Sequence, residues 1–154
     1  MRYLLIAMLA ACGAMNGPKE DGLDESIRSY NDGMRWARFE IAAAHLPPKQ
    51  RSQFVDESDE RAKDLKITDY DVVRIEQHGE REAHVQIKVS WYKNSEGIVR
   101  ETHAMQTWER HGKAWVLVDE QRLRGAEMPG LPEPVEKPDE TADKSAAAEP
   151  AKTP

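Results

Sequence analysis

The sequence predicts an α+β fold, with two N-terminal helices packed on a four-stranded antiparallel meander. Three observations support this prediction. An apolar stripe at helical spacing runs through residues 24–46. Apolar and polar residues alternate without a break through residues 82–92, as expected for a half-buried strand. Short turns separate the segments around that strand, and short turns join consecutive strands of an antiparallel meander.

The composition sets limits on function. A chain of 154 residues is long enough for one ordinary domain with extensions, and 39% hydrophobic residues support one modest core. The net charge of -6, without a basic stripe, disfavours nucleic-acid binding, because Lys and Arg clusters dominate phosphate recognition. The single cysteine, Cys12, excludes an intrachain disulfide and a structural zinc site built on two cysteines.

Residues 1–11 have the pattern of a cleavable signal peptide. Arg2 supplies a short positive region, and residues 3–9 form an apolar run. That run is far shorter than the roughly 20 residues that span a bilayer. It ends in small residues directly before Cys12. Cys12 is then either incidental to an ordinary secretory signal or the point at which the mature chain is modified.

Leu9-Ala10-Ala11-Cys12 resembles the lipobox of bacterial lipoproteins. In that family the cysteine is diacylated, the signal is cut before it and the new amino terminus is acylated. One acyl chain anchors only marginally, at roughly 0.8 kcal/mol per buried CH2, so several chains give lasting attachment. The resemblance implies a lipidated tether over residues 12–23. Gly13, where aspartate would favour inner-membrane retention, implies the outer membrane facing the periplasm, with the inner membrane and cell surface as alternatives.

We expect one α+β domain over residues 24–125. Its first helix, residues 24–46, begins at the N-cap residue Asp24. Pro47-Pro48 ends this helix and begins the second, over residues 48–64, because proline suits a first turn. The apolar face of the second helix is thin. The apolar stripe of the first helix comprises Ile27, Tyr30, Met34, Ala37 and Ile41.

Four strands follow, over residues 67–77, 82–92, 98–110 and 114–123. The lengths of the intervening turns predict the register, in which a slip of one residue would turn every side chain to the other face. The predicted pairs are Ile75 with Ala83, Val73 with Val85, Trp91 with Val99, Val85 with Met105, Trp108 with Trp115, and Met105 with Val118. The face predicted to pack on the first helix comprises Val73, Ile75, Val85, Ile87, Val89, Trp91, Val99, Met105, Val116 and Val118.

Two groups of side chains are candidates for function. The predicted register points His103 and Glu101 inward, with Glu120 opposite His103 and Asp71 on the same face. A buried histidine beside a carboxylate could act as a general acid/base pair, or these groups could form a polar rim or one satisfied ion pair. The predicted outer face carries Tyr92, Trp108 and Trp115, which either stabilise the hairpins or form a contact patch for a partner.

Common motifs for metal binding, nucleophilic catalysis and phosphate binding are missing from the sequence. The five histidines lack H-x-H and H-E-x-x-H spacing, and there is neither a G-x-S-x-G motif nor a Gly-rich phosphate loop. We therefore expect no metal and no cofactor.

Residues 126–154 are rich in Pro, Ala and Glu, with seven acidic and three basic residues. Such a segment buries too little to offset ordering entropy, so it is predicted to be a disordered acidic tail.

The order of two helices and a meander ending in W-E-R-H-G-K-A-W resembles the nuclear-transport-factor-2-like (NTF2-like), cystatin-like domains. This resemblance implies a curved sheet that wraps around the helices as a cone. Enzymes similar to this fold, such as ketosteroid isomerase and scytalone dehydratase, place Asp or His inside the cone. Usual members often have a third helix, for which this chain has little room, so any pocket should be small or open. Residues 30–36 and 67–70 also resemble uncharacterised proteobacterial lipoproteins.

These patterns together predict a membrane-anchored periplasmic lipoprotein. Its expected role is that of a non-enzymatic binding or scaffolding module with a protein partner in the envelope. One alternative is capture of a small apolar ligand in a residual pocket. Another is a small isomerase- or hydrolase-like enzyme that uses His103 with Glu101 or Asp71.

Overall fold

A computed structural model describes residues 22–134 of the chain. The predicted signal peptide, the predicted lipidation site Cys12, most of the predicted tether and the part of the predicted tail beyond residue 134 lie outside the described residues. Within residues 22–134, no helix is both long and apolar enough to cross a membrane.

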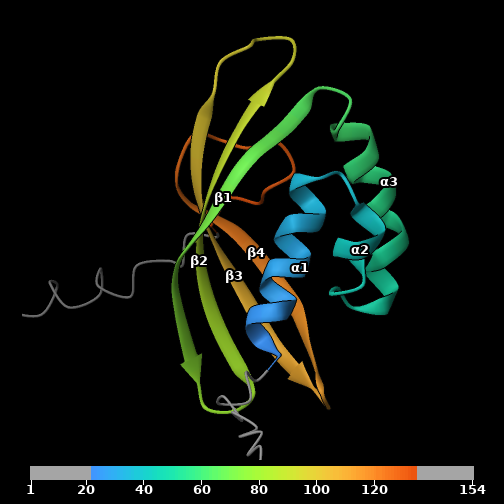
Figure 1. The fold of residues 1–154 in the computed structure, drawn as a ribbon, viewed down its shortest axis with the longest axis vertical. Helices are drawn as coiled ribbons and strands as arrows, with labels where there is room; N and C mark the ends of the chain where they lie inside the picture. Colours follow the sequence, from blue (N-terminus) through green and yellow to red (C-terminus); the bar gives the residue numbers. More distant parts are fainter. Residues whose placement is uncertain (1–21, 135–154) are drawn as a thin grey trace, which may run out of the picture.

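The domain consists of three helices on one side of a four-stranded antiparallel sheet (Figure 1). The strands lie in the order β1-β2-β3-β4, so β1 and β4 form the two edges. This arrangement confirms the predicted α+β meander. The helical elements are α1 (Leu23–Arg35), α2 (Phe39–Ala43), a 3-10 turn (Pro48–Gln50) and α3 (Arg51–Arg61). The strands are β1 (Leu65–His78), β2 (Glu82–Lys93), β3 (Arg100–His111) and β4 (Ala114–Gly125).

The predicted first helix is broken into α1 and α2. Ala37, between them, has a φ of 52°, in the left-handed region that a residue with a side chain enters only at a cost. The break folds α2 back onto α1, where Gly33 meets Ala42. A Cβ added at Gly33 would lie 2.9 Å from the backbone nitrogen of Ala42. The glycine that weakens the helix on propensity grounds is therefore what allows the two helices to pack closely.

The predicted register was wrong at all three strand pairs. Ile75 pairs with Val85, a shift of two residues that leaves its face unchanged, and Val73 lies at a bulge with 53% of its surface exposed. Trp91 pairs with Arg100 rather than Val99, a shift of one residue that turns β3 over. The cause is a longer connection between β2 and β3, where the amides of Glu96 and Gly97 both donate to the Lys93 carbonyl.

The one-residue shift moves the tryptophans of the last hairpin into the core. Trp108 is 0% exposed and packs edge-on against Tyr30 of α1, with ring centroids 6.0 Å apart. Trp115 is 2% exposed. Tyr92 alone of the expected aromatic patch lies on the outer face, where it is half-buried. The buried residues of β3 are Thr102, Ala104, Gln106 and Trp108, whereas Met105, predicted to face inward, lies on the outer face.

The ordered structure continues past the predicted end of the domain. Residues 126–134, assigned from composition to the tail, run on from β4 as the orange-red segment in Figure 1. Three of their apolar side chains, Ala126, Met128 and Leu131, pack against the core.

Candidate ligand-binding cleft

A chain of polar side chains crosses the interior between α1 and the sheet. The Tyr30 hydroxyl donates to Glu120 Oε2 at 2.9 Å. Gln106 Nε2 donates to Glu120 Oε1 at 2.8 Å and to Asn31 Oδ1 at 3.0 Å. Trp108 Nε1 donates to Gln106 Oε1 at 3.3 Å. Each member thus has partners, which makes the chain rigid as well as polar.

Local structure explains why these side chains meet. Tyr30 and Asn31 lie on the face of α1 that packs on the sheet, and both are buried. Gln106 and Glu120 are direct cross-strand partners on β3 and β4. A bulge at Val118 separates Leu117 from the Glu120 region and keeps both on the inner face.

Burial changes the pKa values of the hydrogen-bonded pair Tyr30 and Glu120. Loss of solvent raises the pKa of the Glu120 carboxyl, and the neighbouring charge of Asp119 adds to the rise. The hydrogen bonds from Gln106 and Tyr30 act in the opposite direction, because they stabilise the carboxylate. Burial, followed by the Glu120 charge, raises the pKa of the Tyr30 hydroxyl well above its ordinary value. Tyr30 therefore stays protonated and serves as a fixed donor.

Two hollows reach this polar pair. A small cavity of about 70 Å³ lies between α1 and the sheet, with apolar walls that include Ile87, Val89 and Ala104. A larger cleft of about 420 Å³ opens between α3 and β4, with apolar walls at Leu46, Phe54 and Leu117. Tyr30 and Glu120 line both hollows. The pair is thus reachable from the surface through the larger cleft.

Arg61 of α3 lines both hollows. Its guanidinium donates to Ser58 Oγ at 3.1 Å and contacts Glu57 Oε2 at 3.5 Å. A Cβ at Gly130 would fall 2.5 Å from Arg61 Nε, so the C-terminal segment packs directly on this side chain. Arg61 places one positive charge beside the acidic groups of the cleft, which are Glu57, Asp119 and Glu120.

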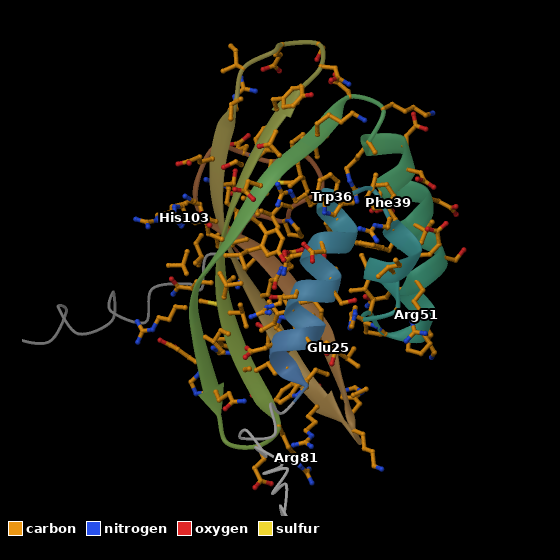
Figure 2. All side chains as sticks on the ribbon, viewed as in Figure 1. Glu25, Trp36, Phe39, Arg51, Arg81 and His103 are labelled. Atoms are coloured by element: carbon orange, nitrogen blue, oxygen red, sulfur yellow. The ribbon has the colours of Figure 1, made fainter. Side chains whose placement is uncertain are left out.

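The predicted acid/base group is not assembled. His103 and Glu101 point away from the helices because β3 is turned over, and Figure 2 shows His103 on the side of the sheet opposite them. Asp71 is also on the outer face, where Lys88 Nζ lies 2.9 Å from its carboxylate and 3.8 Å from that of Glu101. These groups therefore form a surface charge cluster rather than an inner pocket.

Glu120 is the one predicted pocket residue that faces the interior. Its partner across the strands is Gln106, and the expected partner His103 pairs instead with Arg124. Sequence reasoning missed Tyr30, Asn31 and Gln106 as site residues. Tyr30 was counted only as part of the apolar stripe, and the register error placed Gln106 on the outer face. Within residues 22–134, no group of three or more His, Cys, Asp or Glu side chains is placed to hold a metal ion.

Comparisons with known proteins bear on the fold. No family model matches the chain, and no curated protein matches it. A ketosteroid isomerase-like protein from Erwinia carotovora atroseptica matches with a TM-score of 0.53 and 9% identity, covering 66% of this chain and 93% of that one. A scytalone dehydratase-like protein from Novosphingobium aromaticivorans has a TM-score of 0.53 and 11% identity, covering 77% and 93%.

A third solved structure, a SEC-C motif containing protein from Rhodopseudomonas palustris, has a TM-score of 0.56 and 13% identity, covering 64% of this chain and 77% of that one. At such identities the likeness shows the fold alone. The domain has an NTF2-like fold, which the ketosteroid isomerase-like and scytalone dehydratase-like proteins share.

Proposed function

We propose that the protein is a lipid-anchored binding module of the cell envelope. Its ligand is a small molecule with an apolar body and one polar end, held in the cleft between α3 and β4. The observation that carries this proposal is the hydrogen-bonded Tyr30–Glu120 pair, which lines a cleft whose apolar walls at Leu46, Phe54 and Leu117 adjoin polar and charged side chains. Small-molecule sites commonly combine apolar walls with a few polar groups that fix the orientation of the ligand.

The size of the hollows limits the ligand. The cleft, at about 420 Å³, falls within the range of roughly 300–1,000 Å³ that is typical of small-molecule pockets. The inner cavity, at about 70 Å³, has room for a few water molecules or the tip of a ligand. A ligand of one or two fused rings would fit the cleft and direct its polar end at Glu120.

The placement in the envelope is supported by the N-terminal pattern alone. The lipobox-like Leu9-Ala10-Ala11-Cys12 favours acylation of Cys12, and residues 12–23 then join the lipid to the domain. A tether of this kind holds a binding module at the membrane surface without burying its cleft. A role as a scaffold for another envelope protein is compatible with the same anchor.

Titration with 2-naphthol tests the ligand site, because this probe combines two apolar rings with one hydroxyl. Isothermal titration calorimetry of the full chain should show saturable binding that becomes about 3- to 10-fold weaker in Glu120→Gln and Tyr30→Phe, as expected for one lost hydrogen bond. Asp56→Asn, an exposed change on α3, is the control and should leave the affinity unchanged. Equal affinity in all four proteins, or no binding up to about 1 mM, would rule out this site.

Fractionation of cells tests the anchor. The wild-type chain should sediment with membranes, and Cys12→Ala should appear in the soluble periplasmic fraction. Ser29→Ala, a change within α1, is a matched control with an intact lipobox. If Cys12→Ala still sediments with membranes, the lipid-anchor proposal is wrong.

A second function, isomerase-like proton transfer, is favoured by the raised pKa of Glu120 beside a tyrosine hydroxyl. A carboxyl whose pKa is raised by burial is a stronger base than an exposed one, and enzymes use such carboxyls as general acids or bases. The test is deuterium exchange at the carbons next to the carbonyl of 2-tetralone, followed by NMR. Faster exchange with wild type than with Glu120→Gln would support an enzyme, and equal rates would leave only the binding role.

A further inference from the structure

The C-terminal segment packs, like a bound peptide, on a surface formed by Arg61 of α3, Arg122 of β4 and the apolar side chains that line the inner cavity, and we call this surface the groove. Residues 126–134 leave β4 at Gly125 and return past α1 and α3 without joining the sheet. Met128, Pro129 and Leu131 are partly buried, and they form one wall of the inner cavity. Two apolar side chains three residues apart therefore anchor an otherwise irregular chain.

One residue of the edge strand β4, Arg122, contacts both the backbone and the charged side chain of this segment. The Arg122 amide donates to the Pro132 carbonyl at 2.8 Å. The Arg122 guanidinium forms a fork on the Glu133 carboxylate, with Nε 2.7 Å from Oε1 and Nη2 in contact with Oε2. Arg122 also lowers the pKa of that carboxyl, so the contact is ionic at neutral pH. Such forks match the planar geometry of a carboxylate and are specific for it.

The groove also selects for glycine at one position. Gly130 has a φ of 84°, which favours glycine, and a Cβ there would lie 2.5 Å from Arg61 Nε, so the Arg61 side chain would also have to shift. The contacts thus define a pattern of apolar residue, any residue, glycine, apolar residue, any residue and acidic residue. The sequence Met128-Pro129-Gly130-Leu131-Pro132-Glu133 satisfies it.

We propose that this groove is a peptide-binding site that is occupied in cis by residues 128–133. The partner is an extended segment of another protein with the same apolar–x–Gly–apolar–x–acidic pattern, which displaces the intramolecular segment. The ion pair that holds the segment in place is accessible, because half of the Glu133 side chain is exposed. Gly130 and Pro132 of this segment also line the proposed small-molecule cleft, so the two sites adjoin, but the peptide proposal does not rest on the small-molecule proposal.

The test uses the full chain and a fluorescent peptide with the sequence of residues 126–134. In the release variant, Leu131→Asp with Glu133→Arg, the cis segment no longer fits and the groove is unchanged. Fluorescence anisotropy should show peptide binding at least about tenfold tighter to the release variant than to wild type, because the cis segment competes at a millimolar effective concentration. A peptide carrying Gly130→Ala should bind at least about tenfold more weakly than the native peptide.

Near-ultraviolet circular dichroism of the buried tryptophans checks that the release variant is folded. If it is not, Glu133→Arg alone serves as the release variant, since this change is at an exposed position. Equal peptide affinity for wild type and the release variant would overturn the proposal, as would the absence of saturable binding to a folded release variant. Light scattering that shows dimers exchanging this segment would also overturn it, because the occupant would then be a second copy.

Discussion

Removal of the Tyr30 hydroxyl tests the polar chain between α1 and the sheet. In Tyr30→Phe the ring keeps its edge-on contact with Trp108, and Glu120 loses one of its two hydrogen-bond donors. A hydrogen bond to a charged group contributes about 1.5–3 kcal/mol, and a neutral one about 0.5–1.5 kcal/mol. We therefore expect the free energy of unfolding to fall by about 2 kcal/mol when Glu120 is ionised and by about 1 kcal/mol when it is protonated.

The stability cost of Tyr30→Phe should depend on pH, and the raised pKa of Glu120 gives the direction of that dependence. The folded-state pKa of Glu120 is raised, so its contribution to stability is fully present below the ordinary value of 4.5 and is lost as pH rises through the raised value. Tyr30→Phe removes a bond that favours the carboxylate, so its cost should grow with pH over that interval. Urea unfolding followed by tryptophan fluorescence, at about pH 4 and about pH 8, measures the difference.

Tyr70→Phe is the matched control. The Tyr70 hydroxyl also donates to a carboxylate, Asp32 Oδ1 at 3.0 Å, but at the exposed surface. Its loss should cost less than about 1 kcal/mol. The same loss of stability in both variants, or a loss for Tyr30→Phe that does not change with pH, would refute the argument from burial.

Three further predictions concern Ala37 and Gly33, where α1 and α2 meet, and His45, which follows α2. Ala37→Gly should raise the free energy of urea unfolding by about 1 kcal/mol, because it removes left-handed strain. Gly33→Ala should lower it by about 1–3 kcal/mol despite the better helix propensity, since the new Cβ would collide with Ala42. Burial, and then Arg51, lower the pKa of His45, so its contribution to stability should be lost as pH falls from 6.5 through the lowered value. NMR titration of the His45 ring and the thermal midpoint of His45→Gln measure this effect; an unshifted ring pKa would contradict it.

Much of the fold could be predicted from local patterns. Alternation identified residues 82–92 as a strand, and β2 extends by only one residue beyond them. Proline and apolar spacing located the helices, but the break at Ala37 depends on how α2 packs against α1. The contact between α1 and α2 joins two separate segments and produces no periodic pattern in the sequence. The residues 126–134 were missed for a similar reason, because their composition is that of a tail and their anchors are tertiary.

The candidate site was harder to predict because it depends on register. Counting the β2–β3 loop one residue short turned β3 over, and it moved His103 inward and Gln106 outward. Alternation alone cannot correct this error, because both faces of β3 carry polar side chains. Glu120 was placed on the correct face because the bulge at Val118 restored its orientation.

The carboxyl carbon of Glu120 offers the most direct test of the proposed ligand site. Carbon-13 NMR of the labelled full chain, titrated with 2-naphthol, reports on each glutamate side chain separately. Our account predicts a saturable shift of the Glu120 signal and none for Glu101 on the outer face. An unmoved Glu120 signal, or a saturable shift at Glu101 instead, would contradict it.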